Sequence, residues 1–245
     1  MMMTTERRGT QTAGILLLVL VIALSVASVL VHAAPSGASI SNPATETAVN
    51  RSPGSRNDSG GTITTMLLSS VQQILRWKAY VGNVTSVLTL DDAANFTIYD
   101  WDLTSFSGQV YASRYGNLTW STVTCAPQTL VQSESTFYGM TDTSYDINST
   151  FNWSIHKGYT VGGNTITASS CNSTVTYMND TRQVPTTSSP FQEVLVQDAN
   201  SYLVYMADIS DNVQGFDNQT YDFQMIVPES LSGSNTAYYF YLELS

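Results

Sequence analysis

The sequence predicts a mainly β protein: an antiparallel β-sandwich, Ig-like or jelly-roll-like, with an N-terminal hydrophobic helix and a polar linker. Short runs rich in Val, Ile, Tyr and Phe recur along the second half of the chain, and turn residues separate them. The strand–helix–strand rhythm of a parallel sheet is not present. With 245 residues and 42% apolar side chains, the chain is large enough for one sizeable core.

The N-terminal residues 1–33 predict export. Two arginines precede an uncharged, mostly apolar run from Ile15 to Val31. Its length is near the minimum for a membrane-spanning helix and slightly long for the core of a signal peptide. Three fates stay open: a signal peptide cleaved after Ala33, a retained transmembrane anchor, or cleavage after Gly9, where the leader resembles archaeal pilin-type precursors. The glutamate common after such a cut is replaced here by Gly14.

A polar linker and one globular domain are expected after this leader. Residues 34–61 are mainly Ser, Ala, Asn, Pro, Thr and Gly, a composition typical of a flexible linker. Residues 62–245 would form the extracellular β-sandwich domain. At its start the apolar spacing predicts a short helix, although the Thr-rich beginning also permits a strand. The residues with this spacing are Met66, Leu67, Val71, Ile74 and Leu75.

The first predicted strands form hairpins. Residues 84–90 and 96–101 alternate apolar and polar side chains around a turn. Residues 109–115 and 118–125 form a second candidate pair. Pro127 then begins a stretch that favours a helix or a long excursion.

The later strands are the clearest. Residues 159–168 predict a hairpin that turns at Gly162–Gly163–Asn164, because these residues tolerate positive φ. In the last of the final strands, large rings alternate on both faces, which predicts burial on both faces or contact with a neighbouring subunit. The four final strands are expected at residues 191–197, 202–208, 221–227 and 237–244.

Acceptor motifs for N-glycosylation are unusually dense. Ser and Thr number 31 each, yet ten of the fifteen asparagines begin an Asn-x-Ser/Thr motif, more than this composition gives by chance. Turn composition rich in Thr and Asn is the alternative explanation. The ten acceptors are Asn50, Asn57, Asn83, Asn95, Asn117, Asn148, Asn152, Asn172, Asn179 and Asn218.

Cysteine usage also favours an oxidising compartment. Cys125 and Cys171 are the only cysteines, and both follow the hydrophobic segment, so one disulfide is predicted, with two free buried thiols as the alternative. Closing a loop of roughly 45 residues would add about 4 kcal/mol on the chain-entropy model.

The candidate chemistry is sparse, and no catalytic residue is predicted. His156 is the only histidine beyond the leader, and its neighbours lack the glycines of a nucleophile elbow. We expect it to be an exposed or capped turn residue. One acidic loop suggests a weak calcium site, with a solvated loop as the alternative, and no other cofactor is expected. Its residues are Asp208, Asp211, Asp217 and Asp222.

Two parts of the chain carry a family resemblance. The block Trp77–Thr85, with Leu88–Asp92 and Thr97–Trp101, resembles a recurring block in archaeal surface proteins. The ending, Tyr221–Glu229 followed by Tyr238–Leu244, is similar to the close of those chains. Members are uncharacterised exported β-sandwich proteins of the cell surface. The resemblance therefore implies an archaeal cell surface and assigns no reaction.

These observations predict a non-enzymatic, glycosylated extracellular structural protein, either a filament or pilus-like subunit or a surface-layer-associated protein. Its expected partners are other copies of itself or other surface proteins, and the membrane if the N-terminal helix is retained. A net charge of −10 argues against nucleic acid as a partner. The alternative function is a stalked adhesin or carbohydrate-binding module.

Overall fold

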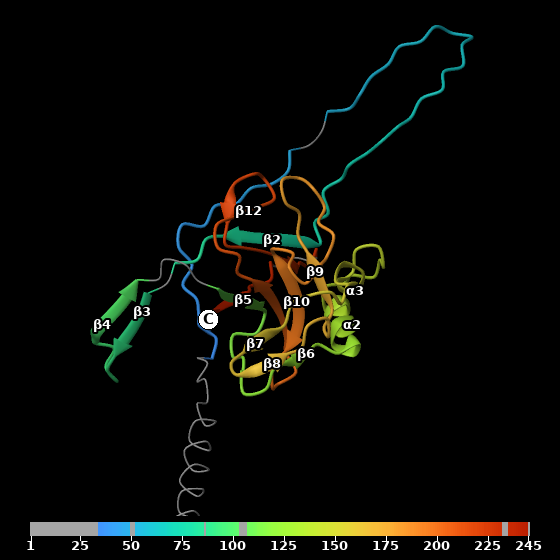
Figure 1. Cartoon of the computed structure of the whole chain (residues 1–245). Coiled ribbons are helices and arrows are strands. Elements are labelled where there is room, and N and C mark those ends of the chain that lie inside the picture. Colours follow the sequence, from blue (N-terminus) through green and yellow to red (C-terminus); the bar gives the residue numbers. More distant parts are fainter. Residues whose placement is uncertain (1–33, 50–51, 86, 103–106, 232–234, 245) are drawn as a thin grey trace, which may run out of the picture. The chain divides into compact units, whose positions relative to one another are not determined.

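The structure, a computed structural model, describes residues 34–49, 52–85, 87–102, 107–231 and 235–244 (Figure 1). The predicted leader and its three fates lie outside these residues. Among the described residues, no helix has the length and apolar character needed to cross a membrane. The described chain is mainly β, and its strand pairs are antiparallel, which confirms that part of the predicted fold class.

Seven strands form the largest sheet. β5 and β11, at its centre, are buried along their whole length, while β6 and β9 are short and share the outer edge of β10. In spatial order the strands are β1 (Ser36–Gly37), β15 (Tyr239–Leu244), β5 (Gly108–Ser113), β11 (Leu203–Asp208), β10 (Gln192–Gln197) and β6 (Thr124–Cys125), with β9 (Ser173–Val175) also paired to β10.

One face of this sheet packs against helices and a strand pair. Because side chains alternate along a strand, Leu195 and Tyr205 lie on this face, where they join a core that Met225 and Phe151 complete. The elements covering the face are α2 (Gln128–Phe137), α3 (Ile147–Thr150) and the antiparallel pair of β2 (Trp77–Gly82) with β14 (Phe223–Pro228).

The opposite face of the sheet packs against a hairpin. Tyr111 and Val196 lie there, in a second core with β7 (Tyr159–Val161) and β8 (Asn164–Ile166). The predicted turn is confirmed: Gly162–Gly163 joins the two strands with φ angles of 52° and 84°, in the left-handed region that glycine adopts without strain.

Two further strand pairs are separate from the large sheet. β3 (Val87–Asp91) and β4 (Thr97–Asp102) form the first predicted hairpin, and among the described residues no other strand pairs with them. β12 (Val213–Gln214) and β13 (Thr220–Tyr221) form a short ladder in the acidic loop.

The predicted hairpin around Gly116 is wrong. Residues 118–123 form no strand, because β11 and β15 already occupy the two edges of β5. β6 pairs with β10 instead.

The predicted helix at residues 66–75 is also absent. All five residues with helical spacing are exposed, so nothing in the described chain buries the apolar side that such a helix would need.

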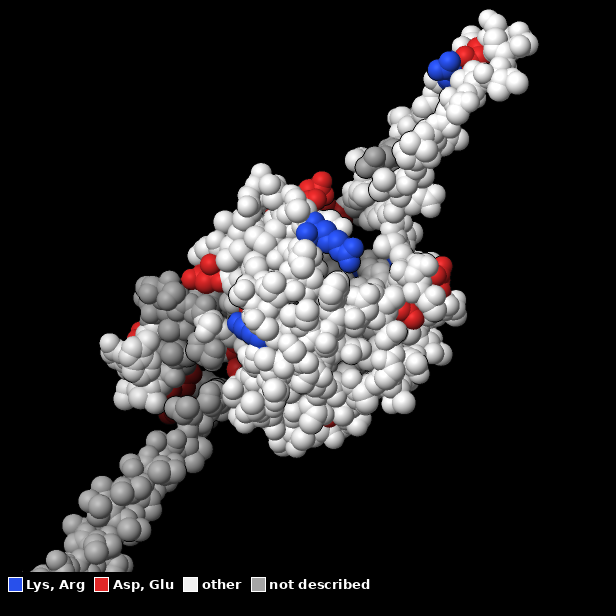
Figure 2. All heavy atoms as spheres, turned by 45° about the vertical axis from the view of Figure 1, so that its right-hand side comes forward, with Lys and Arg blue, Asp and Glu red and all other residues white. Residues whose placement is uncertain are grey.

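The rings of β15 are distributed over both faces. Phe240 packs on the first core and Tyr241 on the second, so burial on both faces accounts for these two rings, whereas Tyr239 is 51% exposed. Charged side chains are few and scattered on the face of the molecule in Figure 2.

A buried carboxyl group connects the large sheet to β14. Glu193, in β10, accepts a hydrogen bond from the backbone N–H of Ile226 at 2.9 Å. Its second oxygen has no hydrogen-bond partner among the described residues. Burial raises the pKa of Glu193 well above its ordinary value, because the charged form loses its hydration.

We expect Glu193→Gln to stabilise the protein near neutral pH. In the unfolded chain this carboxyl ionises near pH 4.5, whereas the folded chain resists ionisation, so wild-type stability falls as the pH rises above that value. Glutamine keeps an oxygen for the Ile226 N–H and carries no charge. Urea unfolding should show a gain of about 1 kcal/mol or more at neutral pH and little difference below pH ~4. Glu193→Leu, which lacks the acceptor, is the control and should not show this gain.

Candidate functional site

The predicted disulfide is confirmed and lies at the edge of the large sheet. Cys125 and Cys171, 46 residues apart, are bonded. Cys125 ends β6, which pairs with β10 at Val196, and Cys171 precedes β9, which pairs with β10 at Val194. The disulfide therefore links two short strands that follow one another along one edge of β10, where each alone has few ladder hydrogen bonds.

His156 supports the turn that leads into Cys171. Its Nε2 accepts hydrogen bonds from the backbone N–H groups of Ser170, at 3.1 Å, and Cys171, at 3.0 Å. The proton is therefore on Nδ1, which donates to the carbonyl of Lys157 at 2.6 Å. Burial lowers the pKa of His156.

Of the two predicted alternatives, an exposed or a capped turn residue, the exposed one is wrong, because His156 is fully buried. Both ring nitrogens contact backbone groups, an arrangement that suits a structural role.

The predicted calcium ligands each have their own partners. Asp222 is buried and accepts from the backbone N–H groups of Val84, at 2.7 Å, and Asn212, at 2.9 Å. Asp208 forms an ion pair of 2.7 Å with Lys157, and burial raises the pKa of Asp208.

The other two aspartates contact neighbours in their own loop. Asp217 accepts from the Tyr221 hydroxyl, and Asp211 accepts from the side-chain amide of Asn212. Within the described ranges, no three His, Cys, Asp or Glu side chains are grouped so as to hold a metal ion. The structure does not bring the four predicted ligands into one site.

The glycosylation acceptors lie mostly at the surface. Asn50 is outside the described residues. Of the nine that are described, only Asn172 is half-buried; it precedes β9, and its carbonyl accepts from the Leu195 N–H. The eight exposed acceptors are Asn57, Asn83, Asn95, Asn117, Asn148, Asn152, Asn179 and Asn218.

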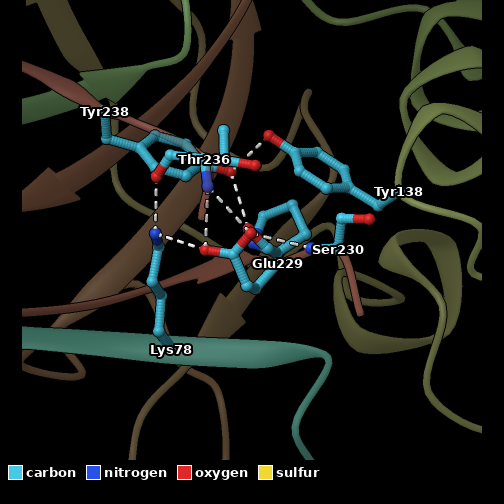
Figure 3. Close-up of polar contacts among 7 residues, drawn as sticks. Lys78, Tyr138, Glu229, Ser230, Thr236 and Tyr238 are labelled. Atoms are coloured by element: carbon cyan, nitrogen blue, oxygen red, sulfur yellow. Dashed lines mark hydrogen bonds and ion pairs between the residues drawn. The ribbon is translucent and has the colours of Figure 1, made fainter. Parts of the chain in front are cut away.

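Sequence reasoning missed a polar cluster that contacts the start of β2 (Figure 3). We call this cluster the β2 clamp, and its residues are Lys78, Glu229, Ser230, Thr236 and Tyr238. The Lys78 ammonium contacts the Glu229 carboxylate at 2.6 Å and the Thr236 carbonyl at 2.7 Å. The same carboxylate accepts from the backbone N–H groups of Ser230 and Thr236. These contacts join β2, the end of β14 and the approach to β15.

The electrostatics of the clamp keep it charged. Burial alone would raise the pKa of Glu229, but hydrogen bonds from Lys78, Thr236 and Ser230 outweigh this and lower it. The Tyr238 hydroxyl lies 2.7 Å from that of Tyr138 and donates to a backbone carbonyl, and burial raises the pKa of both phenols. Because these polar groups bond one another and the backbone, the cluster stabilises the packing of β2 against the end of β14.

Hydrogen bonds fix both ends of β2, and a segment with exposed apolar side chains adjoins each end. Before β2, the Arg76 carbonyl accepts from the Glu229 N–H at 2.8 Å, and after it Val84 is held by Asp222. Residues 62–75, on one side, and the β3–β4 hairpin, on the other, contain many of the exposed large apolar side chains of the described protein. The helical spacing at residues 66–75 was the only sequence signal of this surface.

We expect acid to destabilise the protein through His156. The unfolded chain takes up a proton near pH 6.5, whereas the folded chain resists it, so stability falls as the pH drops below that value and the loss ends below the folded pKa. His156→Gln keeps an acceptor and does not titrate. Between about pH 7.5 and 5, urea unfolding should show a smaller loss for His156→Gln than for wild type. Equal losses in both proteins would refute this role.

Comparison with known proteins found no match: no family model, curated protein or solved structure is significantly similar to this chain.

Proposed function

We propose that the chain is a non-enzymatic, glycosylated extracellular structural protein of the archaeal cell surface, a filament subunit or a surface-layer-associated protein. The observation that carries this proposal is the exposure of eight of the nine described acceptor asparagines. Exposure leaves these side chains accessible for glycosylation, as it does for the exposed asparagines outside motifs. The excess of motifs, ten among fifteen asparagines, is the part that composition alone does not give.

The disulfide supports the same environment. Cys125 and Cys171 stabilise a sheet edge, and such bonds persist in oxidising compartments outside the cell. The resemblance of the Trp77–Thr85 block and of the chain ending to archaeal surface proteins supports an archaeal cell surface. The hydrophobic leader supports export.

The finer fold class belongs to this proposal. The pair β2–β14 faces the large sheet across the first core, so it forms the second, smaller layer of a β-sandwich. The helices α2 and α3 complete that layer.

A carbohydrate-binding module is the second candidate, and one observation favours it. Tyr99 and Trp101 are exposed on β4, with ring centroids 4.8 Å apart, and aromatic faces of this kind contact sugar rings. This alternative predicts saturable binding to a glycan array that Trp101→Ala abolishes.

The structural proposal predicts glycans at the exposed acceptors. Mass spectrometry of peptides from the native protein should find glycans at most of the eight exposed sites. Exposed Asn200 and Asn235, which begin no acceptor motif, are internal controls and should be bare. Unmodified asparagines throughout the native protein would show that the motif count reflects composition only.

A further inference from the structure

The apolar surface beside β2 is divided between two segments. The apolar segment, residues 62–75, has seven large apolar side chains that are each at least 42% exposed: Ile63, Met66, Leu67, Leu68, Val71, Ile74 and Leu75. The second is one face of the β3–β4 hairpin. Soluble proteins rarely leave large apolar side chains exposed in such numbers unless they make a contact.

One face of the hairpin carries its aromatic side chains. Leu90 and Tyr99 are cross-strand partners, and Trp101 follows two residues later on the same face; all three are about half exposed. Thr89 and Asp100, also paired, lie on the opposite face together with the half-exposed Val87. A two-stranded hairpin is marginal by itself in water, so this face requires a cover.

The apolar segment has a matching pattern. Leu67, Val71 and Ile74 have the spacing of one helix face, but such a stripe is stable only when a surface buries it. As a helix, residues 67–75 would be about 14 Å long, close to the ~17 Å of a five-residue strand. Such a helix would contain five of the seven exposed side chains, and Leu67, Val71 and Ile74 would form the face that docking buries.

The topology places the two surfaces at opposite ends of β2. The apolar segment leads into the Arg76 end, where the β2 clamp holds the chain, and the hairpin follows Val84, which Asp222 holds. The six residues of β2 separate these ends by about 20 Å. For one chain to cover its own hairpin, the apolar segment would have to fold back along the whole of β2. A second copy meets no such constraint.

The charges of the two segments favour the apolar segment, and not a second hairpin, as the partner of the hairpin. Asp91, Asp92 and Asp100 make the hairpin acidic, so two hairpins repel each other. Residues 62–75 contain no charged side chain. Sugar binding at Tyr99 and Trp101 would leave the seven exposed side chains of the apolar segment unexplained.

We propose that the apolar segment of one copy docks, as a helix, on the aromatic face of the β3–β4 hairpin of a second copy. Because donor and acceptor are different surfaces, the contact is head-to-tail and each added copy presents a new free end. Such a contact builds an open filament when the rotation between copies does not close a ring. This inference rests on the proposed structural function and specifies its subunit contact.

The test uses the full chain from its host, with and without a non-ionic detergent, so that association through the leader is recognised. The donor variant is Leu67→Asp with Val71→Asp, at exposed positions whose change should not disturb folding. The acceptor variant is Tyr99→Thr with Trp101→Thr, since threonine suits a strand. Gln72→Asp with Gln73→Asp adds the same charge as the donor variant on the opposite side of the helix and is the control.

Sedimentation velocity should show wild type and control forming chains that lengthen with concentration. Each variant alone should require at least ~100-fold higher concentration to associate. A mixture of the two variants should form a 1:1 complex that grows no further, because only one working contact remains.

Other outcomes overturn the inference in distinguishable ways. If both variants assemble as wild type does, the docking contact is wrong and the structural function stands. If wild type is monomeric and hydrogen exchange protects residues 67–75, the segment covers its own hairpin. A wild-type monomer that binds glycans through Trp101 would refute both proposals.

Discussion

The arrangement around β2 depends on the carboxylate of Glu229. The Lys78–Glu229 ion pair is only partly buried, so Coulomb attraction alone contributes little. Its importance is that the same carboxylate also satisfies two backbone N–H groups, of Ser230 and Thr236, at the point where β14 ends. Loss of Glu229 would leave a half-buried ammonium group and two backbone donors without their acceptor, so several weak contacts depend on one side chain.

Two buried titratable groups act on stability in opposite directions. His156 accepts hydrogen bonds only when neutral, so its contribution decreases as the pH falls below about 6.5. Glu193 is easier to bury when protonated, so its cost increases as the pH rises above about 4.5. In the interval between these values the two effects partly cancel. The fold therefore tolerates mild acid better than either group alone would allow.

The sequence was informative where the signal is local. The strands β10, β11, β14 and β15 were predictable because β-rich runs there are bounded by turn residues, and the disulfide followed from a count of two cysteines. The β2 clamp was not predictable, because Lys78 and Glu229 are 151 residues apart and neither has a sequence pattern that indicates the other.

His156 shows the complementary limit. A single histidine in a turn-rich stretch is expected at the surface, and only the tertiary structure places two backbone N–H groups against its ring. At residues 66–75 the helical spacing predicted a helix that is absent, because the described chain supplies no surface to bury its apolar side. Spacing indicates what a segment would bury and leaves open which molecule covers it.

The positions of the acceptor asparagines would allow one subunit to carry both glycans and exposed apolar side chains. Among the described acceptors, none lies within residues 62–75, whereas Asn57 precedes that segment, and Asn83 and Asn95 flank β3 on its two sides. Sugars at these sites would hinder non-specific contacts between apolar segments and leave the hairpin face open between them. If the acceptors carry glycans, as proposed, this steric shielding would add to the repulsion from a net charge of −10 and help to keep a subunit soluble until a second copy docks.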